Sequence, residues 1–264
     1  MTVPFVHLHV RSGFSYGFGV ATPEELVGTA TELGMNALAL TDRDGLYGVP
    51  RFLRAAEETG ASPVVGAEVS VEGGGHVVLL AEGMAGYRNL SKLVTDYRCS
   101  SEDRRRPGCP LSTLLEHAGG LVCLTGAVPL GLLPRLVLSG QGERAREVLG
   151  LLREAFGPAG MFVELTDDRT AGSRRRVGRV AAFAEEQGLP MLATNEVAYL
   201  QPEDHRLHEV LVAASNLSRL PGPGYRPTDQ LYLKPPKRMQ ALFEDRPEAL
   251  RNVAAVAERC AGAV

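Results

Sequence analysis

Two histidines near the N-terminus, His7 and His9, have the spacing needed to share a metal ion. They flank Leu8 within an apolar stretch, residues 5–10, that predicts a strand. Side chains alternate across a strand, so both imidazoles would lie on one face with Cα atoms about 7 Å apart. Imidazole suits Zn, Mn and Fe. A His-x-His pair also arises by chance, so a structural or surface role for both side chains stays open.

Two carboxylates and a third histidine lie in or next to other predicted strands. Glu68 ends the apolar run Val64-Val-Gly-Ala67, where an unpaired carboxylate is costly, so it needs a cation, a proton or a salt bridge to an arginine such as Arg43. Glu196 follows the short strand predicted at residues 191–194. His76 comes directly after three glycines, where a solvated turn histidine and a ligand are equally compatible. With His7 and His9 these residues predict a divalent-metal site.

Other charged residues allow several interpretations. Asp42 and Asp44 flank Arg43 at a strand end, where metal binding, phosphate binding and loop capping are all compatible. The arginine runs 104–106 and 174–176 could contact phosphates, although charge runs are usually solvated. No nucleotide-binding loop, G-x-G-x-x-G fingerprint or G-x-S-x-G elbow is present.

The elements that must position these side chains alternate between short apolar runs and helical patterns. About seven strands alternate with helices, which favours a closed or nearly closed parallel α/β barrel. The glycines at 73–75 predict a hairpin inserted in that alternation. In such a barrel chemistry gathers at the carboxyl ends of the strands. The predicted strands cover residues 5–10, 37–41, 63–71, 76–81, 121–125, 161–165 and 191–194, and the predicted helices include 22–34, 49–59, 87–98, 173–187, 202–217 and 247–260.

The composition excludes several classes of protein. The chain has 264 residues and 44% hydrophobic residues, so disorder is not expected. Its net charge of -3 argues against a basic nucleic-acid-binding surface. Its four cysteines lack C-x-x-C spacing and are too few to indicate a disulfide framework. No signal-peptide pattern and no apolar stretch of membrane-spanning length occurs. A cytoplasmic protein without membrane contact is predicted.

Several motifs, in order along the chain, resemble the polymerase-and-histidinol-phosphatase (PHP) domain of bacterial C-family DNA polymerase III alpha subunits. They include Val6-His-Leu-His-Val10, Thr41-Asp-Arg-Asp-Gly-Leu-Tyr-Gly48, Val65-Gly-Ala-Glu68 and Ala193-Thr-Asn-Glu-Val-Ala-Tyr-Leu200. Residues 162–167 and 247–260 look closest to the error-prone version. The resemblance implies a distorted (β/α)7 barrel. It also implies one PHP domain over residues 1–264, in which 221–264 form an extension that packs on the barrel or leads to a polymerase region.

The resemblance also assigns the site. Intact PHP domains hold up to three metal ions, and here the expected ligands are His7, His9, Glu68, His76 and Glu196, with Asp42 and Arg43 as remnants of the family site. Four family ligand positions carry other residues, namely Phe18, Arg43, Ala127 and Ala198. At most one divalent ion (Zn, Mn or Fe) is therefore expected. Arg43 could supply a fixed positive charge in place of a cation and pair Glu68 or Asp42.

Three functions remain open. The first is a mainly structural PHP module that supports an error-prone polymerase, with polymerase domains of the same or another chain as partners and only indirect contact with DNA. The second is a metal-dependent phosphoesterase or 3′ to 5′ exonuclease, and the third a free-standing interaction protein. Only four residues follow Cys260, so the polymerase palm is expected outside this sequence.

Overall fold

A six-stranded mixed sheet forms the centre of the protein. The computed structural model describes residues 5–103, 107–221 and 225–262. The strands, in spatial order, are β1 (Ala37–Leu40), β2 (Ser62–Ser70), β3 (His76–Ala81), β4 (Leu121–Leu124), β5 (Met161–Thr166) and β6 (Met191–Thr194). β3 is antiparallel to both neighbours, and the other pairs are parallel. The predicted hairpin is confirmed, and the expectation of a parallel barrel is corrected at β3, because a tight turn joins antiparallel strands.

The N-terminal segment joins the two edges of this sheet. Residues 5–10 were predicted as a strand, but they form only one isolated bridge, between Val10 and Val197. The segment still bonds to both edges through its backbone. The bonds are Ala39 N–H to His7 O and Thr41 N–H to Val10 O beside β1, and Val197 N–H to His9 O and Arg11 N–H to Val197 O after β6. The six strands and this segment together make the distorted barrel.

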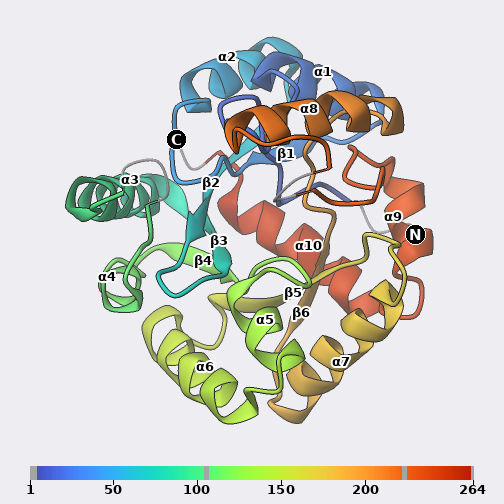
Figure 1. The fold of residues 1–264 in the computed structure, drawn as a ribbon. Helices are drawn as coiled ribbons and strands as arrows, with labels where there is room; N and C mark the ends of the chain where they lie inside the picture. Colours follow the sequence, from blue (N-terminus) through green and yellow to red (C-terminus); the bar gives the residue numbers. More distant parts are fainter. Residues whose placement is uncertain (1–4, 104–106, 222–224, 263–264) are drawn as a thin grey trace.

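Helices surround the sheet (Figure 1). They are α1 (Pro23–Glu32), α2 (Val49–Thr59), α3 (Gly83–Ser100), α4 (Leu111–Glu116), α5 (Leu132–Leu138), α6 (Gly142–Phe156), α7 (Ser173–Glu186), η1 (Pro202–Asp204), α8 (His205–Ser215), α9 (Pro236–Leu242) and α10 (Pro247–Cys260). Local sequence explains several boundaries. Thr22 and Glu25 form a capping box at the start of α1, and Gly34, with φ +80°, follows its end. None of the helices in the described part of the chain is long and apolar enough to cross a membrane.

Apolar side chains on both faces of the strands form the core. β1, β3, β4 and β5 are buried along their whole lengths, as expected for strands covered on both sides. α10 packs against β6, and the side chain of Asn252 donates to the carbonyl of Met191. The polar exceptions to this apolar interior gather where the strands end, and they form the candidate site.

Candidate metal centre

His9 lies between two carboxylates in the interior of the barrel. Its Nε2 atom is 2.8 Å from Oε2 of Glu68, and its Nδ1 atom is 2.7 Å from Oε1 of Glu164. All three side chains are fully buried. Burial by itself lowers the pKa of His9, but Glu164 and Glu68 outweigh burial and raise it to about 9. His9 is therefore an imidazolium at neutral pH, with both ring nitrogens donating.

Arg11 occupies the space next to His9. It follows His9 by two residues in the N-terminal segment, and both side chains reach Glu68. Its Nη2 atom lies 2.6 Å from Oε2 of Glu68 and 2.6 Å from Oε1 of Glu196. Its Nε atom donates to the same Glu68 oxygen at 2.8 Å. A guanidinium that is 4% exposed thus bridges two buried carboxylates.

A second arginine completes the ion pairs around Glu196. Arg226 donates to the Oε2 atom of Glu196 and, at 3.2 Å, to Oδ2 of Asp168. Burial raises the pKa of Glu196, but Arg226 and Arg11 more than offset burial and hold that pKa well below its usual range. Glu196 has a φ of 51°, a left-handed conformation that is rare for a side chain of this size. The ion pairs therefore hold an ionised carboxylate on a strained backbone.

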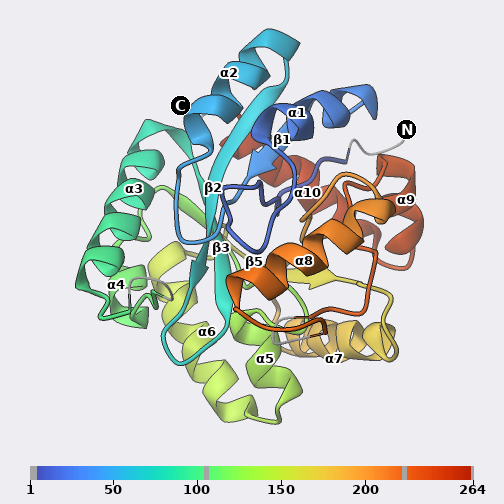
Figure 2. The same cartoon turned by 45° about the horizontal axis from the view of Figure 1, so that its top comes forward.

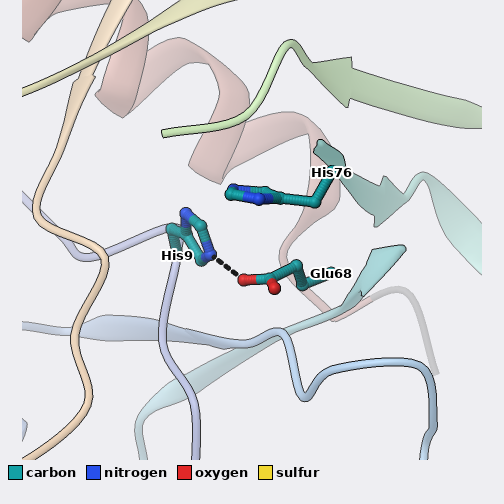
Figure 3. Close-up of side chains that lie close together, drawn as sticks. All are labelled: His9, Glu68 and His76. Carbon is teal, nitrogen blue, oxygen red and sulfur yellow. Dashed lines mark hydrogen bonds and ion pairs between the residues drawn. The ribbon is translucent and has the colours of Figure 1, made fainter. Parts of the chain in front are cut away.

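His76 lies above His9 and Glu68 (Figure 3). The His76 and His9 rings are 5.8 Å apart at an angle of 65°, and the Nε2 atom of His76 accepts from the Ala127 N–H at 3.2 Å. Burial lowers the pKa of His76. One potential ligand atom from each of His9, Glu68 and His76 lies within 4.8 Å of the others. These three are the members of the expected ligand set that the structure brings together.

His7 does not join this group. Its Nε2 atom is 2.9 Å from the carbonyl oxygen of Lys234, its ring meets Phe5 edge-on, and its Nδ1 atom has no hydrogen-bond partner. Burial lowers the pKa of His7 to about 4, so the ring is neutral. The expectation that His7 and His9 would face one site assumed a regular strand, and residues 5–9 are not one. Glu196 also lies outside the group, because Arg11 and Arg226 engage both of its oxygens.

The remnants Asp42 and Arg43 have separate surroundings. Asp42 accepts from the N–H and hydroxyl of Ser12 and from the hydroxyl of Ser15, which fixes the loop after the first segment onto β1. Arg43 lies 4.2 Å from the centre of the Phe18 ring, and its Nε atom is 3.6 Å from Oε1 of Glu68. The predicted pairing of Arg43 with Glu68 is therefore present, at the long end of the ion-pair range.

The remaining charged motifs lie outside the cluster. Arg174 and Arg176 pair with Asp167 and Asp168 at 3.3 and 3.6 Å, and both arginines are partly or largely solvated. The arginine run 104–106 lies outside the described residues. Ala127 and Ala198, at two family ligand positions, are buried and offer no donor atom.

Among the described residues, one group of donors is suitable for a divalent ion. Two imidazoles and a carboxylate are suitable ligands, and Glu68 Oε1 is a buried oxygen without a hydrogen-bond partner. His9, Glu68 and His76 would hold such an ion, which would supply Lewis acidity and a more acidic bound water. Two features oppose it, since His9 must first lose its proton and the Arg11 guanidinium lies beside the same Glu68 oxygen. The neighbouring positions Phe18, Ala127 and Ala198 supply no further donors.

The two arginines that dominate the site were not predicted from the sequence. Arg11 shares the two-residue period of His7 and His9, but no role was predicted for it. Arg226 lies in an irregular segment for which no element was predicted, so nothing in the sequence connected it with Glu196. Glu164 was visible as a carboxylate inside an apolar strand, yet only the folded structure reveals its contact with His9.

The distorted barrel is a fold that solved structures of other proteins share. A putative metal-dependent phosphoesterase from Bifidobacterium adolescentis has a similar fold, with a TM-score of 0.50 and 16% identity over 72% of this chain and 86% of its own. The PHP domain pattern matches residues 7–168. The chain belongs to the PHP domain family, so that resemblance and the distorted-barrel fold are confirmed.

Its curated relatives are bacterial polymerases. The error-prone DNA polymerase of Symbiobacterium thermophilum is 38% identical over 97% of this chain and 25% of its own length. The DNA polymerase III subunit alpha of Escherichia coli is 33% identical over 97% of this chain and 23% of its own. The chain therefore spans about a quarter of the length of the curated relatives it matches.

Proposed function

We propose that this chain is the PHP domain of an error-prone-type DNA polymerase III alpha chain and acts mainly as a structural module. In this proposal residues 1–264 form one domain, and residues 221–264 are an extension that packs on the barrel or leads to a polymerase region. Polymerase domains of the same or another chain are its partners, and DNA contact is indirect. The whole-protein role in replication or repair synthesis is carried over from the polymerases to which the chain is similar.

The observation that carries the structural role is the Arg11 bridge between Glu68 and Glu196. Phosphoester hydrolysis at such sites uses two or more metal ions to activate water and to stabilise the phosphate. Here four basic groups, Arg11, Arg43, Arg226 and His9, already lie against the four carboxyl groups Glu68, Glu164, Glu196 and Asp168. These basic groups already neutralise the carboxylates, so bound metal ions would give the cluster an excess of positive charge.

The second candidate is a single-metal phosphoesterase or exonuclease. The grouping of His9, Glu68 and His76 within 4.8 Å favours it. In that case His9 would be deprotonated in the loaded protein, and Glu164, bonded to its Nδ1 atom, would orient the ring toward the ion as carboxylates do behind histidine ligands. The sequence-based ligands His7 and Glu196 would then serve the ion indirectly or not at all.

Elemental analysis and a nuclease assay distinguish the two. Purified protein is dialysed at pH 7.5 and assayed for Zn, Mn and Fe and for cleavage of single-stranded DNA, beside His76→Ala and the matched control His117→Ala. His117 bonds to Asp96 and lies outside the cluster. The structural proposal expects at most one ion per chain and no cleavage above background. Two or more ions, or a metal-dependent cleavage that His76→Ala removes and His117→Ala retains, would contradict it.

A further inference from the structure

Helix α8 carries apolar side chains on the face that points to solvent. Leu207, Val210, Leu211, Ala214 and Leu217 recur at intervals of three and four residues, which places them on one side of the helix and its C-terminal end. Leu207 and Val210 are 52% and 50% exposed, and Leu217 is 89% exposed. These five residues are called the α8 face below. Figure 2 shows α8 at the front of the molecule, crossing in front of the sheet.

The opposite side of α8 already anchors the helix to the barrel. His208 and Val212 are buried, and the His208 ring packs 5.5 Å from the ring of Tyr199. The Nε2 atom of His205 lies 3.1 Å from the carbonyl oxygen of Arg226. A helix that is attached through one face has no need of apolar residues on the other for its own packing, so the α8 face requires a separate explanation.

Exposed apolar side chains are concentrated near this helix. Of the eleven large ones among the described residues, five lie on α8 or in the segment after it, and three more lie on the loops after the N-terminal segment and after β1. The first group is Leu207, Val210, Leu217, Leu220 and Tyr225, and the second is Phe14, Tyr16 and Tyr47. The loop that contains Tyr16 packs against α8, because a Cβ added at Gly17 would contact Ser215. Clustered exposed apolar groups mark an interaction site, whereas scattered ones do not.

We propose that the α8 face docks the polymerase portion of an error-prone-type polymerase chain; this inference rests on the function proposed above. The relatives align with nearly all of this chain, α8 included, and continue for about three further lengths. α8 has 11 residues, or about 16 Å of helix, and is about 10 Å wide, so one side of it presents on the order of 200 Å², well below the roughly 800 Å² per partner of a stable dimer. A partner tethered in the same chain needs less area, because tethering supplies a high effective concentration. The small size of the α8 face therefore favours this occupant over a second copy.

A chimera tests the docking. The matching quarter of the Symbiobacterium thermophilum error-prone polymerase is replaced by this chain, with and without Leu207→Glu/Val210→Glu. Leu151→Glu, at a 38% exposed leucine on α6, is the matched control. Thermal unfolding and primer extension are measured on each chimera, and hydrogen exchange of residues 205–217 is compared between the chimera and the isolated chain.

The expected result is selective. The double variant should lower primer extension about tenfold and lower the unfolding temperature of the chimera, because charges replace apolar contacts at a docking face. It should leave the isolated chain's unfolding temperature unchanged, and the control should behave as wild type. Residues 205–217 should exchange more slowly in the chimera. Equal exchange in both contexts, or a double variant that matches wild type, would overturn the docking.

Two outcomes separate this inference from the proposed function. A wild-type chimera that folds but does not extend primers contradicts the proposed function, while slower exchange at residues 205–217 in that same chimera still supports docking. A dimer of the isolated chain in light scattering that the double variant dissolves identifies a second copy as the occupant and overturns the proposal.

Discussion

The Nη2 atom of Arg11 lies 2.6 Å from the Oε2 atom of Glu68, and both side chains are buried. Burial lowers the pKa of Arg11 and raises that of Glu68, yet their mutual attraction, together with other nearby charges, reverses both shifts and keeps both groups charged. A buried pair of this kind adds little compared with apolar packing, but removing one partner leaves an uncompensated charge. The barrel therefore depends on Arg11 wherever Glu68 and Glu196 are retained.

Replacing Arg11 should destabilise the fold strongly. Arg11→Met keeps an unbranched stem and removes the charged guanidinium, so Glu68 and Glu196 lose a common partner, at a cost of about 3–5 kcal/mol. Urea denaturation measures this loss. The control is Arg51→Met, because Arg51 pairs with Glu24 at 2.7 Å on the surface, where solvent screens the pair and its loss should change stability little. Equal losses in the two variants would contradict a structural role for the Arg11 bridge.

Stability should depend on pH through His9. Its pKa is about 9 in the folded chain against an unperturbed 6.5, so the folded state holds the proton more tightly. The contribution is fully present below pH 6.5 and is lost as the pH rises through 9, with a full size of the order of 3 kcal/mol. His9→Gln lacks it, so the difference in unfolding free energy between wild type and His9→Gln should shrink between pH 6.5 and 9.5.

The pH dependence of wild-type stability alone would not isolate His9, because Lys234 changes the free energy of unfolding in the opposite direction. Burial lowers its pKa from 10.5 to about 7, so the unfolded chain binds the extra proton above pH 7 and stability rises there. Both proteins retain Lys234, and the subtraction removes its effect. A difference that stays constant from pH 6.5 to 9.5 would show that His9 is neutral in the folded chain.

Metal binding should compete with the same proton. An ion held by His9, Glu68 and His76 requires a neutral His9, so the affinity for Mn²⁺ should rise about tenfold per pH unit up to the pKa of His9. Glu164→Gln removes one of the two carboxylates that raise this pKa, and the rise should then level off at a lower pH. Calorimetric titrations between pH 6.5 and 9 provide the measurement. An affinity independent of pH in wild type is the result that would exclude His9 as a ligand.

A second buried network holds the loop after β1. Tyr97 on α3 donates to Oδ1 of Asp44 at 2.9 Å, and Asp44 has a left-handed φ of 51°. Asp44 also accepts from the backbone and hydroxyl of Ser70. Tyr97→Phe should therefore cost about 1–2 kcal/mol, the price of one lost buried hydrogen bond. Tyr16→Phe, at a 71% exposed tyrosine, should cost nothing measurable in the same thermal unfolding experiment.

The sequence predicted secondary structure well where local patterns determine it. The helix at 49–59 and the strands at 76–81 and 191–194 have the predicted bounds, because glycines or a proline mark their ends and their apolar runs are uninterrupted. The prediction of a strand at residues 5–10 was wrong. This segment lies between β1 and the residues after β6, and its pairing depends on distant backbone that no local pattern describes.

The site was less predictable than the fold, for an electrostatic reason. Residue type suggested that His7 and His9 would act alike, yet their pKa values shift in opposite directions. The difference comes from their neighbours, since His7 meets a backbone carbonyl and His9 meets two carboxylates. These neighbours come from β2, from β5 and from the segment before α9, and they meet the two histidines only once the chain has folded, so composition and spacing could not predict them.

The close approach of two loops at Gly126 gives a final test of how the barrel positions His76. Gly126 has a φ of +89°, and a Cβ there would lie 2.1 Å from the carbonyl oxygen of His76 and 2.6 Å from Cα of Gly131. Gly126→Ala therefore combines an unfavourable backbone conformation with a clash, and should cost at least about 2 kcal/mol. Gly28→Ala is the control, because Gly28 lies inside α1 with open space around it, and it should stabilise by about 0.5–1 kcal/mol. Both are measured by urea denaturation, and a neutral Gly126→Ala would mean that the loop after β4 can move away from His76 without disturbing the cluster.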